Sequence, residues 1–157
     1  MQDHPQPLSA QEALPAMRSI IESGGDFLLH VTGGSMSPTL CGGRDSVLIS
    51  PLLRRVRRGD ILLLQTESRT LLLHRVIKCE KNGNFYTCGD AYEHGEGPFL
   101  PSDVIGIATK LYRKGRCLRS DSLPLRLYGS LWILLLSRRH HILRLLSCRK
   151  KAENSHP

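Results

Sequence analysis

The chain has 157 residues and a formal net charge of +8, with 40% hydrophobic, 23% charged and only 5% aromatic residues. This length is enough for one domain with its own apolar core, so stability needs neither disulfides nor a bound metal. The five cysteines form no Cys-x-x-Cys pair, which argues against a zinc site and a disulfide framework. No cofactor or metal is expected, and the free cysteines favour a reducing compartment.

The first 25 residues predict a tail and a helix. Residues 1–8 carry two prolines and are expected to form the tail. Ser9, with Glu12 three positions later, makes a capping box that predicts a helix to about Ser23. Gly24 and the next glycine end it. The segment lacks the basic-then-apolar order of a secretory signal, so none is expected.

Between residues 26 and 119 the pattern changes to short Val-, Ile- and Leu-rich segments separated by turn residues. This spacing is typical of an all-β sheet or barrel. The expected strands are 27–32, 46–50, 60–65, 71–80, 84–89 and 104–113. The fold is therefore expected to be mainly β. The expected regions are an N-terminal tail and helix (1–25), a β-rich domain (26–119) and a basic C-terminal helix and tail (120–157).

Pro124 is expected to open the C-terminal helix. The stretch from Leu127 to Leu146 is too rich in arginine to span a bilayer, since each arginine costs about 2.5–3.5 kcal/mol at the bilayer centre. Its leucines repeat at helical spacing beside basic residues, which fits a helix lying in a membrane interface. Packing on its own domain or on a partner fits equally well. The chain is thus expected to be cytoplasmic or peripherally membrane-associated.

Ser35 is the candidate nucleophile. It follows Gly33 and Gly34, which permit a tight backbone path, and it precedes a stiffening Pro38. Such a segment can expose a serine hydroxyl beside free backbone N–H groups that face an oxyanion. By composition alone, it is equally an ordinary Gly/Ser/Pro turn.

The downstream motifs decide between these two interpretations. In their order they resemble the catalytic domain shared by type I signal peptidases and repressor-type self-cleaving proteases, the S24/S26-type serine peptidases. The matching stretches are Gly33–Thr39, Arg58–Leu62, His74–Ile77, Gly89-Asp90 and Val104–Gly106. The resemblance covers about residues 27–113. It implies a coiled β-sheet or barrel, and hydrolysis of a peptide bond in an extended leader or signal-like peptide.

The resemblance also bears on the base. Most bacterial signal peptidases and the repressor proteases use lysine, whereas the endoplasmic-reticulum-type signal peptidases use histidine. His74 stands at the base position, so the chain resembles the Ser–His branch. Imidazole titrates near neutrality and can take the serine proton. Lys78 is four residues further along the strand, roughly 13 Å away, and cannot replace it.

Asp90 is the third candidate, as the group that orients His74. If Lys81 to Gly83 form a three-residue loop with Gly83 left-handed, positions 74 and 90 face each other across the hairpin. A two-residue turn would instead turn Asp90 to the opposite face. Asp90 could also simply cap a turn. Glu93 and Glu96 are the alternative acidic partners.

The chain departs from the family pattern in two ways. Gly33 stands where many relatives carry a hydroxyl that helps to bind the oxyanion. No membrane anchor and no helix-turn-helix is expected ahead of Ser35. The leading hypothesis is a serine endopeptidase, and the alternative is a catalytically inactive peptide- or membrane-binding module on the same fold. A nucleic-acid binder is not expected, since aromatics are few and no recognition helix is evident.

Overall fold

The computed structural model describes residues 10–139. Within them, one antiparallel sheet of eight strands has the order β1-β2-β7-β3-β4-β5-β6, and β8 pairs with β7. The strands are β1 (Phe27–His30), β2 (Ser46–Ser50), β3 (Ile61–Gln65), β4 (Leu71–Cys79), β5 (Phe85–Cys88), β6 (Glu96–Phe99), β7 (Val104–Arg113) and β8 (Arg116–Arg119). The mainly β fold expected from the sequence is confirmed.

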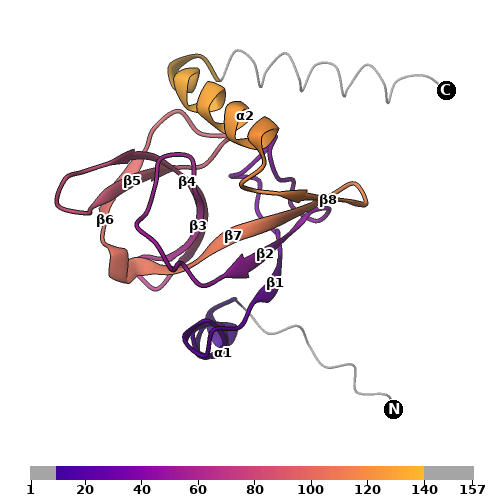
Figure 1. The fold of residues 1–157 in the computed structure, drawn as a ribbon, viewed down its shortest axis with the longest axis vertical. Coiled ribbons are helices and arrows are strands. Elements are labelled where there is room, and N and C mark those ends of the chain that lie inside the picture. Colours follow the sequence, from indigo (N-terminus) through magenta and orange to yellow (C-terminus); the bar gives the residue numbers. More distant parts are fainter. Residues whose placement is uncertain (1–9, 140–157) are drawn as a thin grey trace.

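Helices lie at the two ends of the sheet, with α1 and α2 on opposite sides in Figure 1. They are α1 (Ala10–Glu22) and α2 (Leu123–Leu134), with short 3-10 turns η1 (Pro101–Asp103) and η2 (Leu136–Arg138). Between residues 10 and 139, no helix combines the length and apolar character needed to cross a bilayer. The expected tail over residues 1–8, the Ser9 cap and the part of the C-terminal stretch after residue 139 lie outside the described residues.

The glycines after α1 end that helix as expected. Gly24 adopts a positive φ of 85°, and its N–H donates to the carbonyl of Ile21 at 3.0 Å. The Gly25 N–H donates to the carbonyl of Ile20 at 2.8 Å. This pair of bonds is a Schellman motif, which needs a residue that tolerates the left-handed conformation.

The core lies on both faces of the sheet, and β3 contributes to each side. Ile61 and Leu63 join a cluster with Met36, Val47 and Leu111. The alternate residues Leu62 and Leu64 join a second cluster with Val76, Phe85 and Phe99. Side chains of a strand alternate between faces, so a strand buried on both sides must be apolar throughout. This explains the unbroken Ile-Leu-Leu-Leu run.

Register shifts curl the sheet. They occur in the β2–β7, β3–β7, β4–β5 and β5–β6 pairs. A bulge increases the local twist and bends its strand. In Figure 1, β3 to β6 curl round while β7 runs on from them toward β8. The curl brings the loop after β1 and the segment after β5 to the end of the sheet that carries α2.

The β4–β5 hairpin begins in the expected register and then changes it. Gly83 has a φ of 95°, and Cys79 pairs with Phe85 as a three-residue loop requires. A bulge between Val76 and Lys78 then shifts the pairing by one, so that Arg75 faces Cys88. His74 and Asp90 are therefore not cross-strand partners. Position 90 falls on the face of Arg75, because alternate residues share a face.

Candidate active site

The Ser35 loop follows β1 and is anchored by buried neighbours. Those that are at most 1% exposed are Met36, Thr39 and Leu40. Ser35 itself remains partly exposed, and Gly33 and Gly34 are exposed. The N–H of Ser37 donates to the carbonyl of Gly34 at 3.0 Å and tightens the turn. The segment thus holds a serine at the surface on a loop that is fixed from below.

Free backbone donors flank the serine. Within residues 10–139, the N–H groups of Ser35 and Met36 donate to no backbone carbonyl. A Cβ built on Gly33 or Gly34 would meet no atom within 4 Å, so the space beside these glycines is open. Preorganised N–H donors beside an open space are what an oxyanion hole requires. The backbone therefore offers donors even though Gly33 provides no hydroxyl.

Gly89 lies between the backbone carbonyl of Ser35 and the imidazole of His74. A Cβ on Gly89 would lie 2.7 Å from the carbonyl oxygen of Ser35 and 3.2 Å from Nε2 of His74. Those two atoms are therefore no farther apart than the two distances combined. The N–H of Ala91 also donates to the Ser35 carbonyl, at 2.8 Å. Two of the three predicted residues are thus brought together, and only a glycine leaves enough room between them.

His74 is a buried imidazole. It is 2% exposed, and its Nδ1 has no hydrogen-bond partner among the described residues. The ring of Tyr92 lies edge-on to it, with centroids 6.1 Å apart. Burial lowers the pKa of His74 below its ordinary value, because a cation is poorly solvated there, while the carboxylates of Glu96 and Asp90 act in the opposite direction. The neutral form is therefore favoured.

The structure separates Asp90 from the imidazole and pairs it with arginine instead. Arg75 Nε donates to Asp90 Oδ1 at 2.9 Å, and Arg75 Nη2 donates to Oδ2 at 2.7 Å. The Thr39 hydroxyl also donates to Oδ2. Arg75 is 2% exposed and Asp90 is fully buried. This bidentate pair fixes the chain immediately after Gly89 and the loop that carries Thr39.

Of the two alternative acids, Glu96 is the one that acts on His74. Its carboxylate is the leading influence that raises the pKa of His74, ahead of that of Asp90. Glu96 pairs with Thr87 across β5 and β6, and Thr87 pairs with Val76. Opposite residues share a face, so Glu96 belongs to the face of the sheet that carries His74.

The helix α2 and the turn η2 form a cap over this loop. Trp132 Nε1 donates to the carbonyl of Asp90 at 2.9 Å. Arg139, fully buried, donates through Nη1 to the carbonyls of Gly89 at 3.2 Å and Tyr92 at 3.1 Å. A Cβ on Gly129 would lie 2.7 Å from Arg75 Nη1, so a glycine lets the helix approach that closely. The cap holds the backbone between positions 89 and 92.

The sequence analysis missed four residues that build this arrangement: Thr39, Arg75, Trp132 and Arg139. Arg75 directly follows His74, and Trp132 is the only tryptophan of the chain, so each offered a signal. Arg139 offered no signal of its own among the basic residues of the C-terminal stretch, and the structure shows it to be fully buried. No group of three or more potential metal ligands occurs within residues 10–139.

One family of known proteins matches the chain. A sequence model of the Peptidase S24-like family matches residues 3–93. The match includes Ser35, His74 and Asp90 and ends before α2. None of the curated proteins compared with the sequence matches it. The match covers more than half of the chain and points to a peptidase-related or repressor-protease-like function. The chain belongs to the Peptidase S24-like family.

Proposed function

We propose that the chain is a serine endopeptidase of the signal-peptidase type, with Ser35 as nucleophile and His74 as its base. The observation that carries this proposal is that the backbone carbonyl of a partly exposed Ser35 lies near Nε2 of a buried His74, on the other side of Gly89. The neutral form of that histidine is favoured. Family membership supports the reaction class. Lys78, the lysine nearest to His74 in sequence, is exposed and paired with Glu80, which supports the Ser–His branch.

In the reaction, Ser35 Oγ bonds to the carbonyl carbon of the scissile peptide while His74 takes the hydroxyl proton. The backbone N–H groups of Ser35 and Met36 would receive the oxyanion. His74 then returns its proton to the leaving amine as the C–N bond breaks. A water molecule, deprotonated by His74, hydrolyses the resulting acyl ester and regenerates the serine. The Ser35–His74 hydrogen bond need only form once substrate is bound.

Asp90 acts in this proposal as a positioning residue, not as a hydrogen-bond partner of the imidazole. It holds Arg75 and Thr39 and so fixes the backbone on both sides of the reacting pair. The imidazolium formed during attack is stabilised at a distance by the carboxylates of Glu96 and Asp90. The proposed catalytic group is therefore a Ser35–His74 dyad, held in place by the contacts of Asp90 with Arg75 and Thr39.

The substrate would be an extended peptide. β1 is an edge strand of the sheet and leads directly into the Ser35 loop. An edge strand offers unpaired backbone groups to which an extended peptide can add. We therefore propose a leader or signal-like segment that binds along β1 and presents its scissile bond to Ser35.

On the acid side, kcat/KM should begin to fall only below pH 6.5, which is the ordinary pKa of histidine. We call this fall the acid limb of the pH profile. Burial lowers the pKa of His74, so the imidazole stays neutral and able to accept a proton as the pH falls past that value. The free energy of unfolding should also fall as the pH is lowered. The unfolded chain takes up this proton more readily, so the stability contribution is complete above about pH 6.5 and is lost below it.

Urea unfolding between about pH 5 and pH 7 tests the linkage. The variant His74→Gln should lose less stability on acidification than wild type, whereas Ser68→Ala, at an exposed turn, should respond as wild type. An acid limb above pH 6.5, or an unchanged acid response in His74→Gln, would contradict the assignment.

The proposed activity is tested by incubating the full chain with a library of short peptides, with and without lipid, and reading cleavage by mass spectrometry. Wild type should cleave, and Ser35→Ala and His74→Gln should each lose at least about a thousandfold in kcat. Ser68→Ala, at an exposed turn, is a matched control that should cleave normally. Cleavage that survives in Ser35→Ala would overturn the proposal.

The competing function is a peptide- or membrane-binding module with a decayed site. Gly33 in place of a hydroxyl residue favours it, since losing one oxyanion donor costs on the order of 100–1000-fold in rate. Under this alternative, wild type and Ser35→Ala would bind the same peptides and neither would cleave them. That outcome would replace the peptidase assignment with a binding function.

A further inference from the structure

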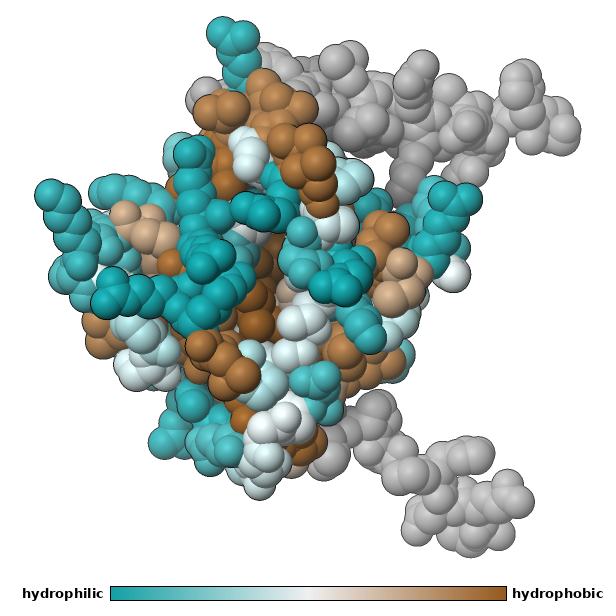
Figure 2. Space-filling view, viewed as in Figure 1, coloured by the Kyte–Doolittle hydropathy of each residue, from teal (hydrophilic) through white to brown (hydrophobic). Residues whose placement is uncertain are grey.

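The outer face of α2 carries a row of exposed leucines. The row consists of Leu123 (68% exposed), Leu127 (60%), Leu131 (55%) and Leu134 (72%). Spacings of four, four and three residues place them on one face of the helix. Trp132 and Ile133, on another face, are buried against the domain. Figure 2 shows the hydrophobic surface above the body of the molecule, where Figure 1 places α2. We call these four residues the leucine stripe.

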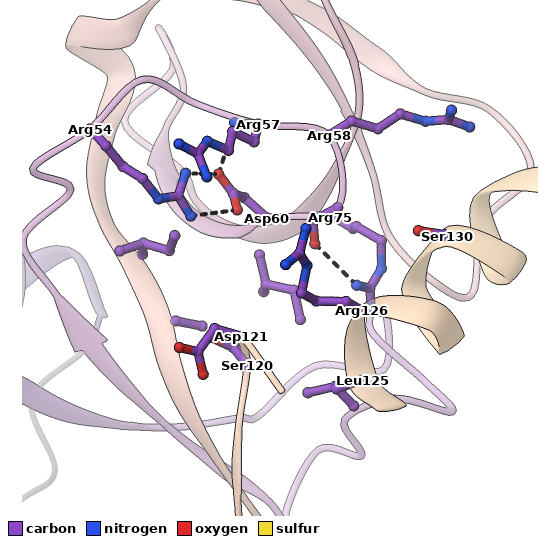
Figure 3. Close-up of a pocket in the computed structure, with 14 residues that line it drawn as sticks. Arg54, Arg57, Arg58, Asp60, Arg75, Ser120, Asp121, Leu125, Arg126 and Ser130 are labelled. Carbon is purple, nitrogen blue, oxygen red and sulfur yellow. Dashed lines mark hydrogen bonds and ion pairs between the residues drawn. The ribbon is translucent and has the colours of Figure 1, made fainter. Parts of the chain in front are cut away.

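A basic cavity of about 330 Å³ lies beside α2. Its walls come from α2, from the segment before β3 and from the start of the segment that leads into α2. Figure 3 shows Arg126 reaching from α2 into this cavity, with Arg57 and Arg58 on the segment across from it. Two acids also line the cavity, Asp60 and Asp121.

The cavity holds an excess of positive charge. Its two acids are already engaged, Asp60 with Arg54 at 2.8 Å and Asp121 with Arg119 at 2.8 Å. Within the described part of the chain, no salt bridge joins Arg57, Arg58 or Arg126 to a carboxylate. We call these three residues the arginine cluster. It is suited to an anion, because guanidinium groups bind phosphate through several N–H donors at once.

The leucine stripe and the cavity form one continuous surface. Arg126 lies three residues after Leu123, and Ser130, which also lines the cavity, lies three residues after Leu127. Residues three apart are neighbours on a helix, so the cavity opens along one edge of the stripe. The leucine stripe and the arginine cluster therefore lie side by side on the surface of α2 and the segment beside it.

We propose that α2 docks the protein on an anionic lipid surface. The leucine stripe would enter the boundary between headgroups and acyl chains, and the arginine cluster would bind lipid phosphates. A row of apolar side chains flanked by cations is the pattern of an interfacial helix, and the net charge of +8 complements an anionic leaflet. The sequence after residue 139 again mixes apolar and basic residues, with Ile142, Leu145 and Leu146 among the basic ones.

Docking would also position the candidate active site. Trp132, on α2, bonds to the carbonyl of Asp90, and Arg139 bonds to the carbonyl of Gly89. The cap is thus joined directly to the loop beside Ser35 and His74. A peptide emerging from the same membrane would meet the site close to the lipid surface. The docking surface itself does not depend on the proposed catalysis, so Ser35→Ala should bind lipid as wild type does.

Flotation of the full chain with lipid vesicles tests this proposal. Wild type should bind vesicles of phosphatidylcholine with 30% phosphatidylglycerol, bind pure phosphatidylcholine at least about tenfold more weakly, and lose binding as salt rises. Leu127→Gln/Leu131→Gln should lose about tenfold or more on anionic vesicles. Arg57→Gln/Arg58→Gln should lose the preference for anionic vesicles.

Matched controls lie elsewhere on the surface. Leu28→Gln replaces a leucine that is 50% exposed on β1, and Arg116→Gln replaces an exposed arginine on β8. Both should bind as wild type, and circular dichroism should show that all variants are folded. Vesicle binding that survives in both α2 and arginine variants would overturn the proposal. So would a concentration-dependent dimer that needs the leucine stripe but ignores lipid, which would assign this face to a second copy.

Discussion

Replacing Gly89 with alanine should lower kcat/KM by at least about a hundredfold. The new Cβ would lie 2.7 Å from the Ser35 carbonyl oxygen and 3.2 Å from His74 Nε2, and the first contact is closer than real Cβ atoms approach an oxygen. The backbone at Gly89 does not require a glycine conformation, since its φ is not positive. The effect is therefore steric. It forces Ser35 away from His74, and a displacement of about 1 Å can cost two orders of magnitude in rate.

A matched substitution separates this effect from a loss of stability. Alanine at Gly106 is equally crowded, with a Cβ 2.6 Å from Ile49 and 2.8 Å from the Ser50 carbonyl, but it lies in β7 beside α1. Each variant should lose about 1–3 kcal/mol in the free energy of unfolding. Only Gly89→Ala should lose far more activity than its loss of stability explains. Equal losses of activity in the two folded variants would show that Gly89 has no special role at the site.

Replacing Asp90 with alanine should lower the free energy of unfolding by about 3–5 kcal/mol. The substitution leaves the Arg75 guanidinium, which is 2% exposed, buried without its carboxylate. It also removes the acceptor of the Thr39 hydroxyl. Urea unfolding at neutral pH measures the change. A loss below 1 kcal/mol would mean that the buried pair contributes little.

A double substitution tests whether the loss comes from leaving the Arg75 charge buried without its carboxylate. Arg75→Met/Asp90→Leu removes both charges, so it should recover much of the stability that Asp90→Ala loses. Asp90→Asn keeps the shape and should fold, with kcat lower by at most about a hundredfold. Its acid limb should move to lower pH, because the carboxylate charge that raises the pKa of His74 is gone. If Asp90 instead oriented the imidazole directly, Asp90→Asn would lower kcat about ten-thousandfold, so the size of the loss separates positioning from direct contact.

The parts of the fold that follow from local patterns could be predicted. β2 and β7 have the bounds expected from their apolar runs, and the left-handed conformation of Gly83 follows from the turn. β6 was missed because it holds Gly97 and Pro98, which normally argue against a strand and are tolerated here at a sheet edge. β8 was missed because its four exposed residues offer no apolar alternation.

Residues of the candidate site could be named from the sequence, but the contacts that surround them could not. Ser35 and His74 could be singled out because their motifs retain family order. The partner of Asp90 could not be predicted. A bulge beside Ile77 decides on which face of the sheet position 90 lies, and no residue type in this segment indicates a bulge. The packing of α2 and η2 over this loop could not be predicted either. Trp132 and Arg139 lie far from the motifs in sequence, and only the tertiary structure brings them to the loop at Gly89.

Covalent labelling with a fluorophosphonate probe, followed by mass spectrometry of the modified peptide, tests the Ser35–His74 assignment most directly. We expect one adduct on Ser35 in wild type, formed at least about a hundredfold more slowly in His74→Gln and at the normal rate in Ser68→Ala. An adduct on another serine, no adduct on folded wild type with lipid present, or a Ser35 adduct that forms equally fast without His74 would contradict it.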